Sequence, residues 1–122
     1  MAPIFNARAA DVFREMAPQD VQLFPVDVEG QADSYSLLVV ARTVRCIHDE
    51  ACEEARYFTP EDGRPERVGE YQVVSGLRID KSKVGDARVF KTWGWRPALI
   101  VDGQIKSALD QAGIVGGYFE EA

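Results

Sequence analysis

The chain has 122 residues, of which 46% are hydrophobic and 28% are charged. This length predicts a single domain, residues 1–122, with a core of its own, and this composition excludes a disordered or fibrous chain. Twenty acidic and fourteen basic residues give a net charge of −6, which repels phosphate backbones, so we expect no nucleic-acid partner.

The hydropathy pattern points to a chain that stays where it is made. The longest uncharged apolar run, Leu37–Ala41, is far shorter than the roughly 20 residues that a helix needs to cross a bilayer. Residues 1–6 contain no basic residue and no long apolar stretch follows them, so the pattern of a signal peptide is missing. We therefore expect a cytoplasmic protein without a membrane partner, in which Cys46 and Cys52 are free thiols.

The N-terminal part of the chain predicts a helix followed by a strand. Apolar residues at helical spacing predict an amphipathic helix over Phe5–Met16, with Asn6 as N-cap and Pro18 beyond its end. Val21–Glu29 is typical of a strand, but the face that carries its apolar residues changes at Phe24–Pro25. Because proline cannot donate to a sheet, this change predicts an edge strand or a bulge.

The middle of the chain alternates between strands and turn-rich segments. After a turn, Tyr35–Ile47 predicts a long strand in the centre of a sheet, because part of it is apolar on both faces. The acidic segment His48–Arg56 fits a short helix or a loop, and Thr59–Gly69 is rich in turn formers, which predicts a surface excursion. Clean alternation predicts a strand over Tyr71–Ile79, and another strand begins in Arg88–Thr92.

The C-terminal part adds a strand, a helix and a last strand. Pro97–Val101 predicts a short strand, Gln104–Ala112 a helix that Gly113 ends in a left-handed conformation, and Val115–Glu120 a closing strand. The order of elements lacks the regular alternation of a doubly wound fold. It predicts an α+β domain with a mostly antiparallel or mixed sheet and two flanking helices.

The sequence offers little evidence for catalysis. Cys46, His48 and Cys52 lie within seven positions, together with two acidic residues, and could belong to a metal site or a catalytic site. Structural zinc sites, however, take ligands from two separated pairs, and the chain has no second pair. Neighbours on one strand also rarely form a nucleophile and base pair. We therefore expect no catalytic residue, no metal and no cofactor.

Two features suggest protein binding instead. The segment Trp93-Gly94-Trp95-Arg96 concentrates the residue types that dominate interface energetics, although core packing with a bulge at the glycine explains it equally well. On an extended backbone both tryptophan rings would share one face. The second feature is the acidic stretch Glu50–Asp62. It is either a solvated surface without a role or a surface that steers a basic partner during association. The candidate partner-binding residues are Trp93, Trp95, Arg96, Glu50, Glu53, Glu54, Glu61 and Asp62.

Three stretches taken together resemble a known family. They are EDGRPERVGEY (Glu61–Tyr71), SGLRIDKSKVGDARVF (Ser75–Phe90) and WGWRPALIV (Trp93–Val101), followed by a helix and Gly116–Phe119. Their order resembles the immunity-protein domain of myxobacterial polymorphic toxin systems, the eleventh catalogued immunity family, and the segment Asn6–Gly30 is similar as well. Members are commonly longer at the N-terminus, so the resemblance implies a shortened form.

The resemblance implies a cytoplasmic protein that neutralises a cognate toxin by binding it, with no catalytic residues to carry over. One alternative is an inhibitor or chaperone of another secreted effector, such as a protease. A different alternative is a small metal-binding protein or enzyme built around Cys46-His48-Cys52. The expected partner is thus a protein toxin or secreted effector, and association of the chain with itself is also possible.

Overall fold

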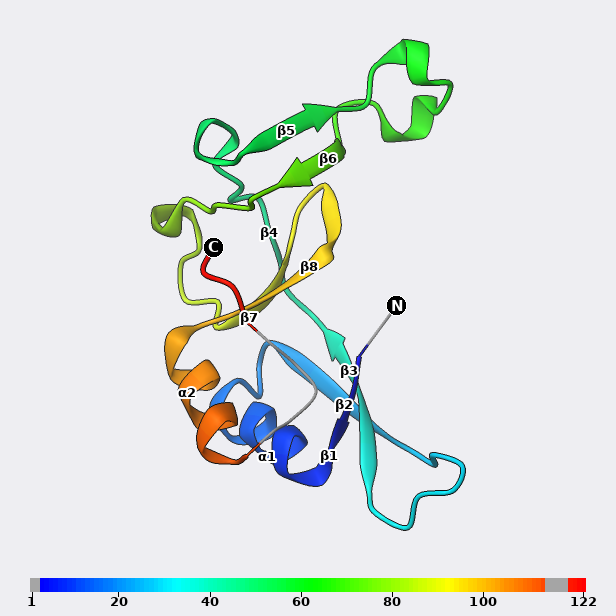
Figure 1. The fold of residues 1–122 in the computed structure, drawn as a ribbon, viewed down its shortest axis with the longest axis vertical. Helices are drawn as coiled ribbons and strands as arrows, with labels where there is room; N and C mark the ends of the chain where they lie inside the picture. Colours follow the sequence, from blue (N-terminus) through cyan, green and yellow to red (C-terminus); the bar gives the residue numbers. More distant parts are fainter. Residues whose placement is uncertain (1–2, 114–118) are drawn as a thin grey trace. The chain divides into compact units, whose positions relative to one another are not determined.

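The computed structural model describes residues 3–113 and 119–122, and it confirms the predicted α+β class (Figure 1). Four single 3₁₀ turns lie at Asp49–Ala51, Pro60–Asp62, Pro65–Arg67 and Lys81–Lys83. Among the described residues, no helix is both long and apolar enough to cross a membrane. The helices and strands of this part of the chain are β1 (Ile4–Asn6), α1 (Ala7–Met16), β2 (Val21–Val26), β3 (Tyr35–Val40), β4 (Thr43–Val44), β5 (Glu54–Tyr57), β6 (Tyr71–Ser75), β7 (Val89–Thr92), β8 (Trp95–Val101) and α2 (Gly103–Gln111).

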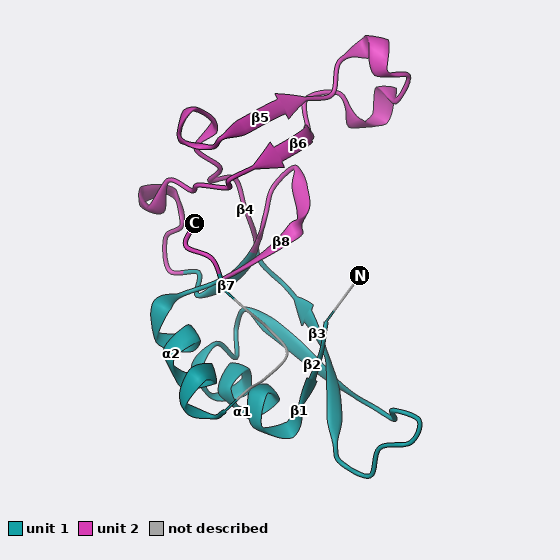
Figure 2. Ribbon diagram, viewed as in Figure 1, with its two compact units in different colours: residues 1–42, 87–90, 101–119 teal, residues 43–86, 91–100, 120–122 magenta. Residues whose placement is uncertain are grey.

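The chain forms two compact units, each built from separate segments (Figure 2). Unit 1 comprises residues 1–42, 87–90 and 101–119, and unit 2 comprises residues 43–86, 91–100 and 120–122. Strands β7 and β8 each contribute residues to both units. The expectation of a single domain over residues 1–122 stays a prediction.

Unit 1 holds an antiparallel sheet in the order β1-β3-β2, with α1 on one face (Figure 1). The core is built where helix and sheet meet: Phe13 and Leu38 are almost fully buried, and the ring of Phe13 lies 5.0 Å from that of Phe5. β2 is an edge strand, as Pro25 predicts. Its six pairs with β3 run without interruption, so β2 contains no bulge.

Both helices of unit 1 begin at a side-chain cap. Asn6 accepts a hydrogen bond from the N–H of Ala9 at 2.9 Å, and Asp102 accepts one from the N–H of Ile105 at 2.8 Å. Each cap satisfies a backbone donor that the first helical turn leaves without a partner. At the end of α2, Gly113 adopts the left-handed conformation with a φ of 72°. The predicted cap at Asn6 and the predicted helix end at Gly113 are therefore confirmed.

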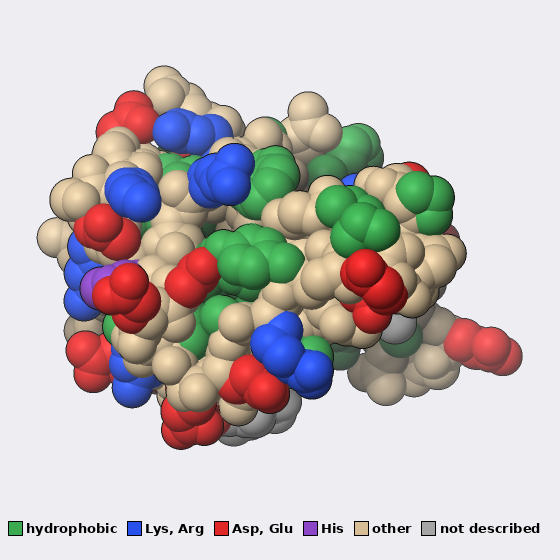
Figure 3. Space-filling model, turned by 90° about the horizontal axis from the view of Figure 1, so that it is seen from above, with side chains coloured by type: hydrophobic (Ala, Val, Ile, Leu, Met, Phe, Trp, Pro, Cys, Tyr) green, Lys and Arg blue, Asp and Glu red, His purple; other side chains and the backbone are tan. Residues whose placement is uncertain are grey.

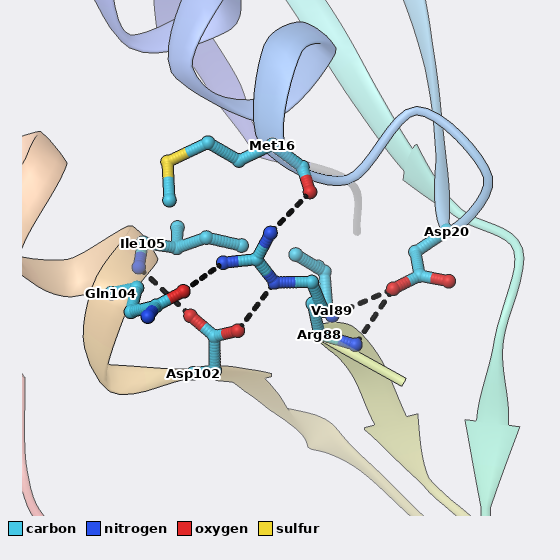
Figure 4. Close-up of polar contacts among 7 residues, drawn as sticks. All are labelled: Met16, Asp20, Arg88, Val89, Asp102, Gln104 and Ile105. Carbon is cyan, nitrogen blue, oxygen red and sulfur yellow. Dashed lines mark hydrogen bonds and ion pairs between the residues drawn. The ribbon is translucent and has the colours of Figure 1, made fainter. Parts of the chain in front are cut away.

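Asp20 and Arg88 join the separate segments of unit 1 (Figure 4). The Asp20 carboxylate is only 4% exposed and accepts hydrogen bonds from the backbone N–H groups of Arg88 (2.7 Å) and Val89 (3.1 Å). It also pairs with Arg42 at 3.2 Å. One buried carboxylate thus fixes the start of β7 against the segment that precedes β2.

The guanidinium group of Arg88 completes this junction. It donates to the backbone oxygen of Met16, the carboxylate of Asp102 and the side-chain oxygen of Gln104, at 2.8, 2.6 and 2.8 Å. Burial by itself would raise the pKa of Asp102, but the hydrogen bonds from Arg88 and Ile105 hold this pKa below its ordinary value. The end of α1 and the start of α2 are therefore fixed by the same side chain.

Unit 2 contains the antiparallel pair β5–β6, which has a register shift at Arg56/Tyr57. It also contains β4 and most of β8, together with the end of β7. In the second three-stranded sheet, in the order β4-β7-β8, β4 runs parallel to β7 through the pairs Thr43–Lys91 and Val44–Thr92. The excursion over Thr59–Gly69 contains no buried residue, as its turn formers predict.

The structure corrects three sequence predictions. Tyr35–Ile47 is not one strand: β3 ends at Val40, because Thr43 and Val44 pair with β7 in another sheet as β4. The strand predicted to reach Ile79 ends at Ser75, where Gly76 turns the chain with a φ of 57°. The acidic segment contains a 3₁₀ turn followed by β5. Most of the predicted closing strand lies outside the described residues, and residues 119–120 form no strand.

Candidate interaction surface

The tryptophan segment forms a hairpin turn in unit 2. Trp93 and Gly94 are the two turn residues between β7 and β8, and Gly94 has a φ of 79°. This φ is open to glycine and strained for other residues. The oxygen of Gly94 accepts from the N–H of Tyr71 at 3.1 Å, and the N–H of Trp93 donates to Val44 at 2.8 Å. The turn is therefore fixed to two neighbouring segments of unit 2.

The two tryptophan rings are half-buried, so neither is fully enclosed by the core. The guanidinium carbon of Arg45 lies 4.2 Å from the centre of the Trp93 ring, at the distance of a cation–π contact. The expectation that both rings share a face of an extended strand is wrong, because Trp93 lies in the turn and Trp95 starts β8. Arg96, the third predicted anchor, is exposed.

A tyrosine pair lies next to this hairpin, and the sequence analysis missed it. The rings of Tyr57 and Tyr71 stack with centres 4.6 Å apart, and both hydroxyl groups donate to the carboxylate of Asp49. The hydrogen bond to Asp49 raises the pKa of Tyr57. Burial is the main cause that raises the pKa of Tyr71, and the hydrogen bond to Asp49 raises it further. The cluster joins β5 and β6 to the turn before them.

The five acidic candidates all lie in unit 2, and all are exposed. Glu54 pairs with Arg56 at 3.2 Å, Asp62 accepts from the N–H of Thr59 at 2.7 Å, and Glu53 accepts from the Ser75 hydroxyl at 3.4 Å, so three of them also have local structural roles. Figure 3 shows one face of the molecule with its side chains coloured by type. Acidic side chains alternate there with basic and hydrophobic ones and do not merge into one continuous patch. The remaining acidic candidates are Glu50 and Glu61.

A comparison with protein families assigns the chain. The family model described as "Immunity protein family (Imm11)" matches residues 4–122. The chain belongs to the Imm11 family. No curated protein and no solved structure matched the chain in parallel comparisons. Membership in Imm11 suggests a role in neutralising a toxin, and immunity proteins are typically not enzymes.

The cysteines and the histidine of this Imm11 chain are not gathered into one site. Cys46 is buried, and burial raises the pKa of its thiol, which disfavours the reactive thiolate. Cys52 accepts from the N–H of Arg78 at 3.3 Å, whereas His48 is exposed. Both cysteines are free, as predicted. Within residues 3–113 and 119–122, no three acidic, histidine or cysteine side chains are grouped closely enough to hold a metal ion.

Proposed function

We propose that this Imm11 protein is a cytoplasmic immunity protein that neutralises its cognate toxin by binding it directly. The observation that carries the proposal is the family match over residues 4–122. Direct binding follows from the chemistry of such a task, because an inhibitor needs a stable scaffold and a complementary surface and needs no active site.

The tryptophan hairpin supplies the proposed anchors. An inhibitor that protects its own cell needs a nanomolar Kd, about −12 kcal/mol, which a standard interface reaches only through a few well-buried side chains. Trp93 and Trp95 present half-buried rings on a turn that backbone hydrogen bonds fix in place, and Arg96 is exposed beside them. Such a preorganised turn loses little conformational freedom on binding.

In this proposal the acidic residues of unit 2 attract the toxin and speed its association with the protein. Long-range attraction between the net charge of −6 and a basic toxin raises the association rate and is screened by salt. Reversing the charge of the candidates therefore slows association more than it speeds dissociation. These candidates are Glu50, Glu53, Glu54, Glu61 and Asp62.

The test is co-expression of the chain with the toxin encoded beside its gene. We expect the chain to rescue growth and to co-purify with that toxin as a stable complex. Replacing Trp95 with alanine speeds dissociation and costs about 2 kcal/mol of binding free energy. Val68→Ala, at a side chain of unit 2 that is 46% exposed, serves as the control. Failure of the wild-type chain both to bind and to rescue contradicts the proposal.

A further inference from the structure

The sheet of unit 1 has an outer face that α1 does not cover. Residues paired across antiparallel strands lie on the same face. The pairs Ile4–Leu37 and Phe24–Leu37 therefore place one side chain from each of β1, β3 and β2 in a single row. The neighbouring residues Phe5 and Leu38 point to the opposite face, where Phe5 meets α1. The row thus lies on the face turned away from the helix.

This outer face is apolar, although much of it is open to solvent. Ile4 is 53% exposed and Phe24 is 48% exposed. Among the next outward positions, Tyr35, Val26 and Val39 are hydrophobic and half-buried, whereas Asn6 and Gln22, at the ends of the face, are polar and exposed. A sheet with one solvated face normally carries polar residues there. An apolar patch of this kind is typical of a surface that another molecule covers.

The β2–β3 loop forms an acidic rim at one end of this face and contains no basic residue. The loop between β2 and β3 bears Asp27, Glu29 and Asp33, all of which are exposed. No lysine or arginine occurs anywhere between Arg14 and Arg42, a range that includes both strands and their loop. None of the three carboxylates forms an ion pair with a residue that the structure describes.

We infer that the outer face of β1, β3 and β2 is a docking surface for the toxin, which meets it with an apolar patch flanked by basic residues. The inference rests on the proposed function and names a contact surface in addition to the tryptophan hairpin. The negative charge of the acidic rim favours a basic toxin over a second copy of this chain as the occupant of the face. Two copies joined through this face would bring their carboxylates together, whereas a basic partner neutralises them.

The size of the face fits the central part of an interface. Two strands of six residues and one of three, about 4.8 Å apart with about 3.4 Å for each residue, span roughly 250 Å². A standard interface needs roughly 800 Å² on each side, with an apolar centre and a polar rim. The β2–β3 loop with its three carboxylates supplies a polar rim of the required kind.

The test measures binding of the full chain to the toxin encoded beside its gene. We expect Phe24→Lys and Ile4→Lys each to raise the Kd at least about tenfold, mainly through faster dissociation. Replacing Asp27, Glu29 and Asp33 together with lysine should slow association. The matched control is Val68→Lys, because Val68 is 46% exposed and lies in unit 2. Thermal unfolding of each variant checks that it is folded. Phe24→Thr removes the apolar ring but keeps a residue that favours a strand, so it tests the contact with less risk to the fold.

The outcomes separate the two proposals. If the wild-type chain binds and both lysine variants bind equally well, the docking surface is wrong and the proposed function stands. If the wild-type chain does not bind, the proposed function fails and the docking surface fails with it. If the chain alone sediments as a dimer that Phe24→Lys converts to a monomer, a second copy occupies the face and the inference is overturned.

Discussion

At the scale of single residues, the structure depends on a few polar side chains with several partners each. Asp20 is buried, and its carboxylate serves two backbone N–H groups and Arg42. Arg88 contacts the end of one helix and the cap of the other. A buried polar group with all its partners specifies one arrangement, because removing any partner leaves another group unsatisfied.

We expect Asp20→Asn to lower the free energy of unfolding by about 2 kcal/mol, because the amide keeps one acceptor oxygen and loses the charge that Arg42 faces. Urea unfolding followed by circular dichroism measures this loss. Asp27→Asn is the control, since Asp27 is exposed. Equal stability of the two variants would contradict the role given to Asp20.

The tyrosine cluster predicts a dependence of stability on alkaline pH. The pKa values of Tyr57 and Tyr71 are raised in the folded protein, so folding favours the protonated hydroxyls. Their contribution is fully present below the unfolded pKa of about 10 and is lost as the pH rises above it. The double variant with phenylalanine at both positions should show a smaller loss between pH 9 and pH 11, estimated as about one unit on either side of that pKa. Parallel curves for the variant and the wild type would contradict this prediction.

At the scale of elements, the tryptophan hairpin shows how a glycine determines a turn. A Cβ atom on Gly94 would lie 3.2 Å from the ring of Tyr71, in addition to the strain of a φ of 79°. Gly85 also has a positive φ, of 65°, but a Cβ atom there would meet nothing within 4 Å. Substitution at Gly85 therefore measures backbone strain alone, whereas substitution at Gly94 measures backbone strain together with a steric contact.

We expect Gly85→Ala to cost about 1 kcal/mol through backbone strain alone, and Gly94→Ala to cost about 2 kcal/mol or more. Thermal unfolding of the two variants beside the wild type gives the comparison. If both alanines cost the same, the contact between Gly94 and Tyr71 contributes nothing.

The elements that the sequence predicted well are those with local signals. Asn6 and Pro18 mark the ends of the first helix because caps and helix stops act on the adjacent backbone. The break between β3 and β4 depends on the pairing of Thr43 and Val44 with β7, far along the chain, and no local pattern reports it. The change of face at Phe24 predicts an edge strand or a bulge, and the structure shows the edge strand. The apolar outer face that it creates was recognised only from the pairing with Leu37.

The sequence predicts which residue types form the candidate site, but it does not predict how they are arranged in space. The tryptophans and acidic residues were found because their residue types are unusual at interfaces. The stacking of Tyr57 on Tyr71 was missed, since it requires the pairing of β5 with β6 across the excursion between them. The pattern of the segment before Tyr57 fits a short helix or a loop, so it predicts no strand pairing that would bring the two rings together.

At the scale of the whole molecule, we expect the two units to unfold as one domain, because β7 and β8 pass from one unit into the other. Both tryptophans lie in unit 2, whereas α1 and α2 lie in unit 1. Tryptophan fluorescence and the helical circular dichroism signal therefore report on different units. Coincident urea transitions by the two probes support a single cooperative domain. Two separate midpoints would show that the units unfold independently.

The contact between Asp20 and Arg88 also has a consequence for the order of events during synthesis. Their hydrogen bond joins residues 68 positions apart, and Arg88 also contacts Asp102, the cap of the helix that begins at residue 103. Contacts of such long range form late in folding, because a large loop must close first. The ribosome therefore releases β1, α1 and the β2–β3 hairpin before the residues that complete unit 1 have been made. A growing chain therefore lacks a complete unit 1 until the helix that begins at residue 103 has left the ribosome.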